Sequence, residues 1–157
     1  MNVGFEVFDL QKLASNLNVL PMIEESLVVA MPAAHLLASQ PQITVSDLAT
    51  EKLILPSIDE FPFYQEFISY CNQSGFQPQI VRTVKATWLV TILSLVLARI
   101  GIAILPSNVQ NLQRQGIVYR NIHAENLSRQ ISAIWRQDNS SPVLDQFLEV
   151  VREVADR

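Results

Sequence analysis

The sequence is poor in the side chains that catalytic and metal sites most often use. It has one cysteine, Cys71, and two histidines, His35 and His123, among 157 residues. A single cysteine forms no internal disulfide and no thiolate metal site, and the two histidines do not have a zinc-binding spacing. We therefore expect no metal and no cofactor. A lone thiol is also typical of a reducing compartment, so the cytoplasm is the expected location.

Positive charge is scarce as well. Eleven Lys and Arg stand against fifteen Asp and Glu, which gives a formal net charge of -4, and the basic residues are scattered from Lys12 to Arg157 without a cluster. A protein that binds nucleic acid must neutralise several phosphates at one surface. We therefore expect no direct DNA binding by this chain.

Glycine-dependent motifs are missing. Four glycines are too few for a flexible linker, and the sequence has no phosphate-binding glycine loop, no Gly-x-Ser-x-Gly elbow and no dinucleotide fingerprint. The adjacent carboxylates Asp59 and Glu60 do not form an acid–base pair, because neighbouring side chains do not converge, and a solvated loop is expected there. No enzyme activity is predicted.

Structural roles are expected for the few reactive side chains. Cys71 falls on the apolar face of a predicted helix, which favours a buried inert thiol over a nucleophile in an accessible, electropositive setting. His35 follows a predicted strand, so it is expected to pack or to stabilise a turn, with ligand contact as the alternative.

One long apolar run has the length of a membrane span. Residues 86–105 are mostly apolar and number twenty, but Arg99 lies within them, and a charge near the bilayer centre costs roughly 2.5–3.5 kcal/mol. Gly101 and the residues up to Pro106 fit a turn and a buried strand better. We expect no membrane segment, and no N-terminal signal for secretion is recognised.

Strand-like and helix-like segments alternate along the chain. The expected strands are 3–7, 27–31, 53–55, 79–84, 102–105, 117–120 and 131–135, and the expected helices begin near Pro62, Thr87 and Pro142. The first helix has a periodic apolar face from Tyr64 to Cys71 and ends at Gly75. The second, up to Ala98, is apolar nearly all round and is therefore expected to be buried. This alternation predicts an α/β fold with a parallel or mixed sheet.

Helix caps and the last apolar stripe can also be assigned. Ser46 is expected to cap a short helical turn, and Ser141 to cap the final helix. The apolar stripe of that helix is formed by Val143, Leu144, Phe147, Leu148 and Val151.

The expected sheet also indicates where a ligand would bind. In open α/β sheets, ligands lie beyond the carboxyl ends of the strands, where helix N-termini present free backbone N–H groups. Three loops meet this description: 56–62, 85–88 and 106–109. Their candidates for contact with a small anion are Ser57, Phe63, Lys85, Thr87 and Ser107. Ordinary capping and loop solvation remain the alternative for each.

Several stretches, taken in order, resemble the LysR-type transcriptional regulators. They are Asn2-Val-Gly-Phe5, Glu25-Ser-Leu-Val-Val-Ala-Met-Pro32, Ala34-His-Leu-Leu-Ala38, Val45-Ser-Asp-Leu48, Leu53-Ile-Leu-Pro56, Phe63-Tyr64, Ser74-Gly-Phe-Gln-Pro78, Thr91-Ile-Leu-Ser-Leu-Val96, Gly101-Ile-Ala-Ile-Leu-Pro106 and Pro142-Val-Leu-Asp-Gln-Phe-Leu-Glu149. Their order and spacing cover almost the whole chain. The resembled subgroup responds to aromatic catabolites or similar small carboxylates.

The resemblance implies a fold like the type-2 periplasmic binding proteins, in which two Rossmann-like α/β subdomains hold an effector in the cleft between them. Residues 1–22 would be a remnant of the first subdomain and a crossover, residues 23–106 a complete second subdomain, and residues 107–157 the return crossover and the rest of an incomplete first subdomain. Phe61, Pro62 and Phe63 match the loop that lies against the effector, and Pro106 and Ser107 match a crossover. With Ser57 and Thr87 they form the expected effector-binding set.

The chain also departs from the family pattern. No helix-turn-helix is recognised, so the chain is expected to act with itself or with a full-length homologue. Arg99 stands where the family commonly has a glycine, and a non-glycine residue with positive φ there costs on the order of 1 kcal/mol. Leu36 replaces a usual proline. The alternatives are a solute-binding or transferase protein of the same fold, and a non-functional truncated remnant.

Overall fold

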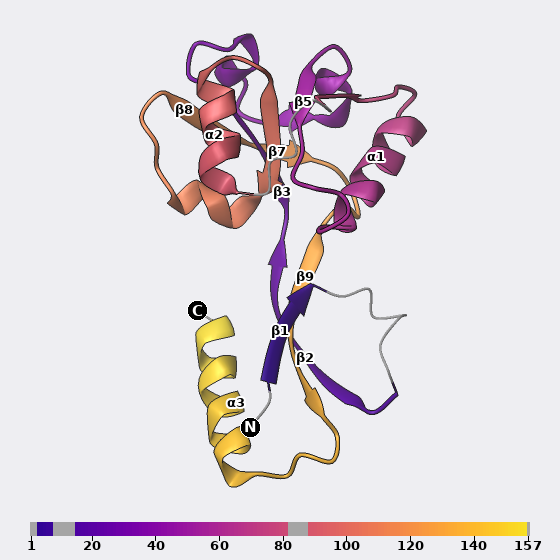
Figure 1. The fold of residues 1–157 in the computed structure, drawn as a ribbon, viewed down its shortest axis with the longest axis vertical. Coiled ribbons are helices and arrows are strands. Elements are labelled where there is room, and N and C mark those ends of the chain that lie inside the picture. The colour runs from indigo at the N-terminus through magenta and orange to yellow at the C-terminus, as the bar shows by residue number, and fades with distance from the viewer. Residues whose placement is uncertain (1–2, 8–14, 82–87, 157) are drawn as a thin grey trace. The chain divides into compact units, whose positions relative to one another are not determined.

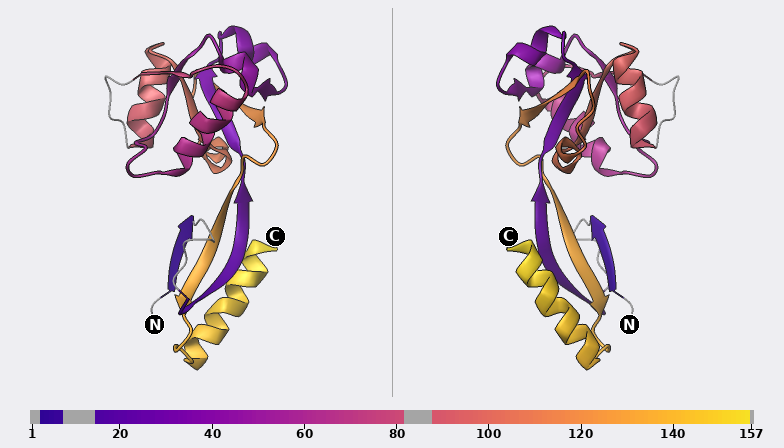
Figure 2. Two further views of the ribbon diagram at one scale, coloured as in Figure 1. Left: turned by 90° about the vertical axis from the view of Figure 1, so that its right-hand side faces the viewer. Right: turned by 90° about the vertical axis from the view of Figure 1, so that its left-hand side faces the viewer.

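A computed structural model describes residues 3–7, 15–81 and 88–156 of the chain. It consists of two compact units (Figures 1 and 2). Residues 26–127 form the larger unit, and residues 1–25 together with 128–157 form the smaller one. Among the described residues, no helix is long and apolar enough to cross a membrane.

The larger unit is built on a six-stranded mixed sheet, as the alternation of strands and helices predicts. Its strands are β3 (Leu27–Pro32), β4 (Ile43–Thr44), β5 (Lys52–Ile54), β6 (Gln79–Ile80), β7 (Ile102–Pro106) and β8 (Ile117–His123), in the order β4-β8-β3-β7-β5-β6. β5 runs parallel to β6 and β7, and β4 parallel to β8, whereas β3 is antiparallel to both β7 and β8. The α/β class is therefore confirmed.

The two long helices of the larger unit cover opposite faces of this sheet. α1 (Phe63–Gln73) buries Tyr64, Phe67 and Cys71 in one apolar cluster, and α2 (Leu89–Leu97) buries Ile92, Leu93 and Val96 in another. Successive residues of β3 and β7 alternate between the two clusters. Strands covered on both faces must be apolar at every position, which explains the continuous runs at 27–31 and 102–105.

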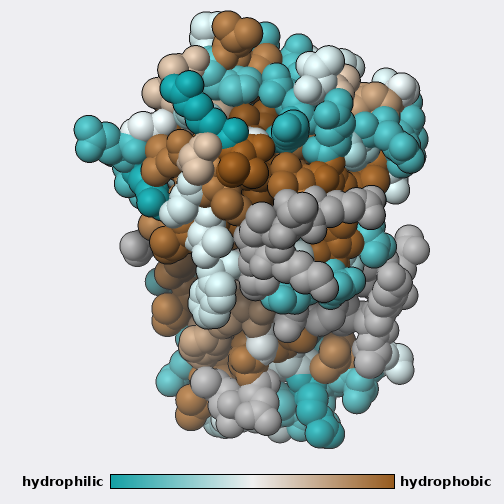
Figure 3. All heavy atoms as spheres, turned by 45° about the horizontal axis from the view of Figure 1, so that its top comes forward, coloured by the Kyte–Doolittle hydropathy of each residue, from teal (hydrophilic) through white to brown (hydrophobic). Residues whose placement is uncertain are grey.

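α2 differs from its prediction in one respect. The helix is apolar nearly all round, but only one face is buried, and Val90 is 71% exposed on the other side. Trp88, which precedes the helix, is exposed too. The interpretation of α2 as a fully buried helix was wrong, because the sheet covers one side of it and no second layer of the described chain covers the other. Figure 3 shows that brown, apolar atoms reach the surface between teal, hydrophilic ones.

Short 3₁₀ helices complete the larger unit: η2 (Leu36–Ser39), η3 (Val45–Leu48) and η4 (Ser107–Asn111). The turn predicted at 46–48 is present, but Ser46 is not its cap. Thr44 is the N-cap, and both its N–H and its hydroxyl donate 2.8 Å hydrogen bonds to the carboxylate of Asp47. The helical turn begins at Val45, so the cap is Thr44, two residues before the expected Ser46. His35 caps η2 through Nδ1, which accepts from the Leu37 N–H at 3.2 Å, and the predicted turn-stabilising role is confirmed.

The smaller unit contains a three-stranded sheet and the last helix. β9 (Arg129–Arg136) lies between β1 (Val3–Val7) and β2 (Leu17–Glu25) and is antiparallel to both. The sequence did not predict β2. Its register shifts between Pro21 and Ile23, and proline is tolerated in an edge strand at such a bulge.

α3 (Pro142–Ala155) packs on the smaller unit's strands. Leu144, Leu148 and Val151 are buried, and Phe147 meets Phe5 edge-to-face at 6.3 Å between ring centroids. Val143 is exposed, so it lies outside the buried stripe, contrary to expectation. Ser141 occupies the N-cap position, but its hydroxyl forms no capping hydrogen bond with the described helix, and Pro142 is at the start of the helix as predicted.

Residues 107–127 belong to the larger of the two compact units, and β8 within this stretch pairs with β3 along Val28–Pro32. The division into subdomains at residues 22 and 106 stays a prediction of the resemblance. The chain leaves the smaller unit after Glu25 and returns to it at Ser128. Of the expected strand 79–84, β6 covers Gln79–Ile80 and Val81 lies outside it, while residues 82–84 are outside the described part of the chain.

The turn that follows α2 confirms the expectation for Arg99. The N–H of Arg99 bonds to the carbonyl of Val96, and the N–H of Ile100 to that of Leu95, which is the hydrogen-bond pattern of a Schellman motif. Arg99 occupies its left-handed position with φ of 59°. Glycine usually stands there, because a side chain costs about 1 kcal/mol in this conformation.

Candidate functional site

The sequence-predicted residues that the structure describes follow strands that end on one side of the larger unit's sheet. β5 and β7 are parallel neighbours in the register Leu53 to Ile102 and Ile54 to Ala103, so both strands end at the same edge. The loop that contains Ser57 follows β5, and Ser107 follows β7 directly. The carboxyl ends of adjacent parallel strands are where ligands bind in open α/β sheets.

The loop after β5 is a compact turn that leads into α1. The carbonyl of Ser57 accepts hydrogen bonds from the N–H groups of Phe61, at 2.9 Å, and of Glu60, at 3.2 Å. The Phe61 carbonyl in turn accepts from the Tyr64 N–H at 3.1 Å. Phe61 and Pro62 are exposed and Phe63 is half-buried. An aromatic surface therefore lies at the N-terminus of α1.

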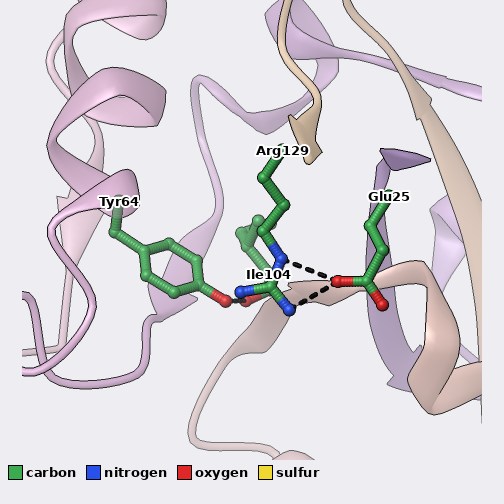
Figure 4. Close-up of polar contacts among 4 residues, drawn as sticks. All are labelled: Glu25, Tyr64, Ile104 and Arg129. Carbon is green, nitrogen blue, oxygen red and sulfur yellow. Dashed lines mark hydrogen bonds and ion pairs between the residues drawn. The ribbon is translucent and has the colours of Figure 1, made fainter. Parts of the chain in front are cut away.

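Tyr64 anchors this loop, although its spacing in the sequence predicts only a position on an apolar helix face. Its side chain is 1% exposed, and its hydroxyl donates a 3.1 Å hydrogen bond to the carbonyl of Ile104 in β7 (Figure 4). Its ring also meets Phe63 edge-to-face at 6.1 Å. A buried tyrosine needs a hydrogen-bond partner for its hydroxyl. That requirement was the signal in the sequence that Tyr64 ties α1 to another element.

The end of β7 is fixed by main-chain hydrogen bonds. The Ser107 N–H donates to the carbonyl of Ser26 at 2.9 Å, and Pro106 pairs with Leu27 in the sheet. Neither the hydroxyl of Ser57 nor that of Ser107 has a hydrogen-bond partner within the described parts of the chain. Both serine residues are only partly buried.

Two further candidates cannot be placed at this edge. Thr87 and Lys85 lie outside the described residues, so the loop before α2 remains a prediction. The other candidates, Ser57, Phe61, Pro62, Phe63, Pro106 and Ser107, all belong to the larger unit, on the side where β5 and β7 end.

An ion pair that the sequence analysis missed holds the last residue of β2 to the first residue of β9. Arg129 Nη2 lies 2.6 Å and its Nε 2.8 Å from Glu25 Oε2 (Figure 4). Glu25 is 3% exposed, and Arg129 is 13% exposed. A second side-chain contact lies next to this ion pair, because the Ser128 hydroxyl donates a hydrogen bond to the carboxylate of Glu24. Nothing in the sequence showed that residues more than a hundred positions apart would meet here.

Cys71 has the buried, structural position that its place on an apolar helix face predicts. Cys71 is fully buried on α1, and burial raises the pKa of its thiol from 9.0 to about 11. Such a thiol is protonated and inaccessible near neutral pH. In the described ranges, no three His, Cys, Asp or Glu side chains lie close enough together to hold a metal ion.

Comparison with known families gives one match over nearly the whole chain. The model of the LysR substrate binding domain matches residues 7–156. The HTH-type transcriptional regulator AlsR of Bacillus subtilis is 33% identical over 124 residues, which are 78% of this chain and 40% of that protein. The regulator TtuA of Agrobacterium vitis is 31% identical over 147 residues, 90% of this chain and 48% of that protein. The chain thus spans less than half the length of these relatives.

Solved structures give the same fold. CbnR, a LysR family transcriptional regulator, superposes with a TM-score of 0.79 at 25% identity, over 98% of this chain and 52% of that one. The effector binding domain of BenM with its effector benzoate has a TM-score of 0.83 at 22% identity, over 98% of this chain and 69% of that one. The fold is therefore of the type-2 periplasmic-binding-protein kind. The matched domain is regulatory rather than catalytic, and the chain belongs to the LysR family, of which it forms a substrate-binding domain.

Proposed function

We propose that this chain senses a small organic anion, a carboxylate in the first instance, at the carboxyl ends of β5 and β7. One observation supports the proposal: Ser57 and Ser107, whose hydroxyls lack partners among the described residues, follow parallel strands that end at the same edge of the sheet. Hydroxyl groups donate to a carboxylate, and such charge-assisted hydrogen bonds are stronger than neutral ones.

The surroundings of these hydroxyls suit an anion with an apolar body. α1 begins at Phe63, and the N-terminus of a helix carries a partial positive charge. Phe61 and Phe63 supply aromatic surface beside it. A structural neighbour, the BenM effector binding domain, is described with benzoate as its effector, which is an aromatic carboxylate.

Isothermal titration with benzoate as the probe tests this site. Ser57→Ala and Ser107→Ala should each weaken binding about fivefold to tenfold, because one hydrogen bond to a charged group is lost in each. Ser69→Ala is the matched control, since Ser69 is on α1 and lies away from this edge. Equal affinities for the wild type and both variants would contradict the proposal.

The regulatory role extends beyond ligand binding. In this proposal the chain acts in the cytoplasm, associates with itself or with a full-length homologue, and does not bind DNA alone. The exposed apolar side of α2, with Trp88 and Val90, supports association, because contiguous apolar surface is usually covered in solution. Sedimentation velocity should show a concentration-dependent dimer or larger species. A monomer at every concentration would contradict this part.

A further inference from the structure

The larger unit has a cavity at the end of its sheet opposite to the Ser57–Ser107 edge. β3 ends there and β5 and β7 begin there, as their antiparallel and parallel registers require. The cavity measures about 390 Å³, and its lining includes His35, Leu36, Glu51, Lys52, Arg99 and Ile100. None of the sequence-predicted effector residues is among them.

The charges that line this cavity have an excess of positive sign. Lys52 and Arg99 contribute two cations, and neither has an ion-pair partner in the part of the chain that the structure describes. The one carboxylate of the lining, Glu51, lies 3.3 Å from Nε2 of His35. The whole chain has a formal charge of -4. The charged side chains that line the cavity are thus more positive than the rest of the protein, which favours an anionic ligand.

Apolar side chains lie beside the two cations. Leu36 is 89% exposed and Ile100 is 42% exposed, although both are large aliphatic residues. The view in Figure 3 brings the top of Figure 1 forward, and brown atoms are exposed between teal ones there. Exposed aliphatic groups next to cations suit a ligand that has both a charged head and a short apolar body.

Backbone geometry holds this lining in place. A Cβ added to Gly101 would lie 2.5 Å from the Lys52 carbonyl oxygen, so the backbone at Gly101 and the backbone at Lys52 are in close contact at the cavity. Arg99 keeps its left-handed backbone at a cost of about 1 kcal/mol. His35 is held through both ring nitrogens, by the Leu37 N–H and by Glu51. A backbone held in this way lowers the cost of ordering the site when a ligand binds.

We propose that this cavity is a second ligand site, which binds a small organic anion with a carboxylate or phosphate head and a short aliphatic or aromatic body. Lys52 and Arg99 hold the head, and Leu36 and Ile100 cover the body. The volume lies in the range of about 300–1,000 Å³ that small-molecule sites occupy. The inference rests only on residues of the larger unit and does not require the site proposed at the opposite edge.

Titration of the isotopically labelled chain with hexanoate, followed by NMR, tests the inference. The amides of Ile100 and Gly101 should shift saturably. Arg99→Gly should raise the Kd for hexanoate at least about fivefold, because one of the two cations is removed. The variant should fold well, since glycine favours the left-handed backbone at this position. Lys52→Met should have a similar effect on the Kd.

A control variant separates this site from general charge effects. Arg152→Gln removes an exposed cation of α3 that does not line the cavity, and it should leave the Kd that is read from the Ile100 and Gly101 amides unchanged. Hexan-1-ol and inorganic phosphate should each bind more weakly than hexanoate, because each lacks one half of the ligand. No saturable shift at Ile100 and Gly101, an unchanged Kd in Arg99→Gly, or equal binding of hexan-1-ol or phosphate would overturn the inference.

Discussion

The two units of the chain differ in what their interiors contain. In the larger unit, two apolar clusters fill both faces of the sheet. Among its described residues, the smaller unit buries the apolar side chains of Ala133, Leu144, Leu148 and Val151, and the two buried polar residues of the described chain, Glu25 and Ser132, also lie there. The larger unit is thus stabilised mainly by hydrophobic burial, whereas the smaller one depends more on specific polar contacts.

The two tryptophans allow this difference to be measured in one protein. Trp135 is half-buried in β9 of the smaller unit, and Trp88 is exposed beside α2 of the larger unit. Tryptophan fluorescence should therefore report mainly on the smaller unit, because an exposed indole changes its environment little on unfolding. Hydrogen exchange of the amides in β3 and β7 should report on the larger unit.

The largest effect is expected from opening the apolar cluster under α1. Phe67→Ala removes a fully buried ring and should lower the free energy of unfolding of the larger unit by about 3–5 kcal/mol. The measurement is urea unfolding followed by hydrogen exchange in β3 and β7. Phe61→Ala, at an exposed aromatic residue, is the control and should change stability by less than about 1 kcal/mol. Equal losses in the two variants would contradict the account of the core.

The smaller unit should be most sensitive to loss of its buried ion pair. Arg129→Met leaves the Glu25 carboxylate buried without its cation, which should cost about 3 kcal/mol in urea unfolding monitored by fluorescence. β9 contains its own control, because Arg136 forms an ion pair with Asp138 in which both side chains are 65% exposed. Arg136→Met should cost less than about 1 kcal/mol. A similar loss in both variants would show that burial of the pair is unimportant.

Replacing one glycine in each unit by alanine should change stability by smaller amounts, with a loss in the larger unit and no loss in the smaller one. Gly101→Ala places a methyl group 2.5 Å from the Lys52 carbonyl, a backbone atom that moves only with its strand, and should cost about 1–3 kcal/mol. Gly4→Ala meets only the Ile134 side chain, at 3.5 Å, and should be neutral or slightly stabilising. Thermal unfolding of the two variants measures both. A neutral Gly101→Ala would show that β5 and β7 can separate freely at that point.

The smallest effect concerns pH. Burial raises the pKa of the Cys71 thiol from 9.0 to about 11, so the folded chain retains a proton that the unfolded chain releases. This contribution to stability is complete below pH 9 and is lost as the pH rises towards 11. Urea unfolding at several pH values should show a steeper loss of stability over this range in the wild type than in Cys71→Ala. Parallel pH profiles for the two proteins would contradict the assignment to Cys71.

Local patterns predicted most of the larger unit, and long-range contacts explain what was missed. The periodic face from Tyr64 to Cys71 and the apolar run 102–105 depend on neighbouring residues, and both were predicted correctly. β2 was missed because Pro21 and the polar residues around it conceal an edge strand that contains a bulge. The exposed side of α2 could not be foreseen either, since sequence hydrophobicity does not distinguish a helix covered on both sides from one covered on a single side.

The candidate site also has one part that the sequence predicted and another part that only the folded chain shows. Ser57, Phe63 and Ser107 could be chosen because they follow predicted strands, and the register of β5 and β7 brings them to one edge. The tie from Tyr64 to Ile104 and the pair of Glu25 with Arg129 join residues 40 and 104 positions apart. No periodicity within a single segment encodes such partners, so they emerged only from the folded chain.

The position of β9 between β1 and β2 has a consequence for how the chain folds as it is synthesised. The larger unit is one continuous segment, and all of its strands have been made once residue 123 has been added. β1 and β2 are made before the larger unit, yet they do not pair with each other, and their shared partner is the strand that begins at Arg129. During translation the larger unit can form while the opening strands remain unpaired. The smaller unit is therefore the last part to assemble, through contacts that close a loop of about a hundred residues.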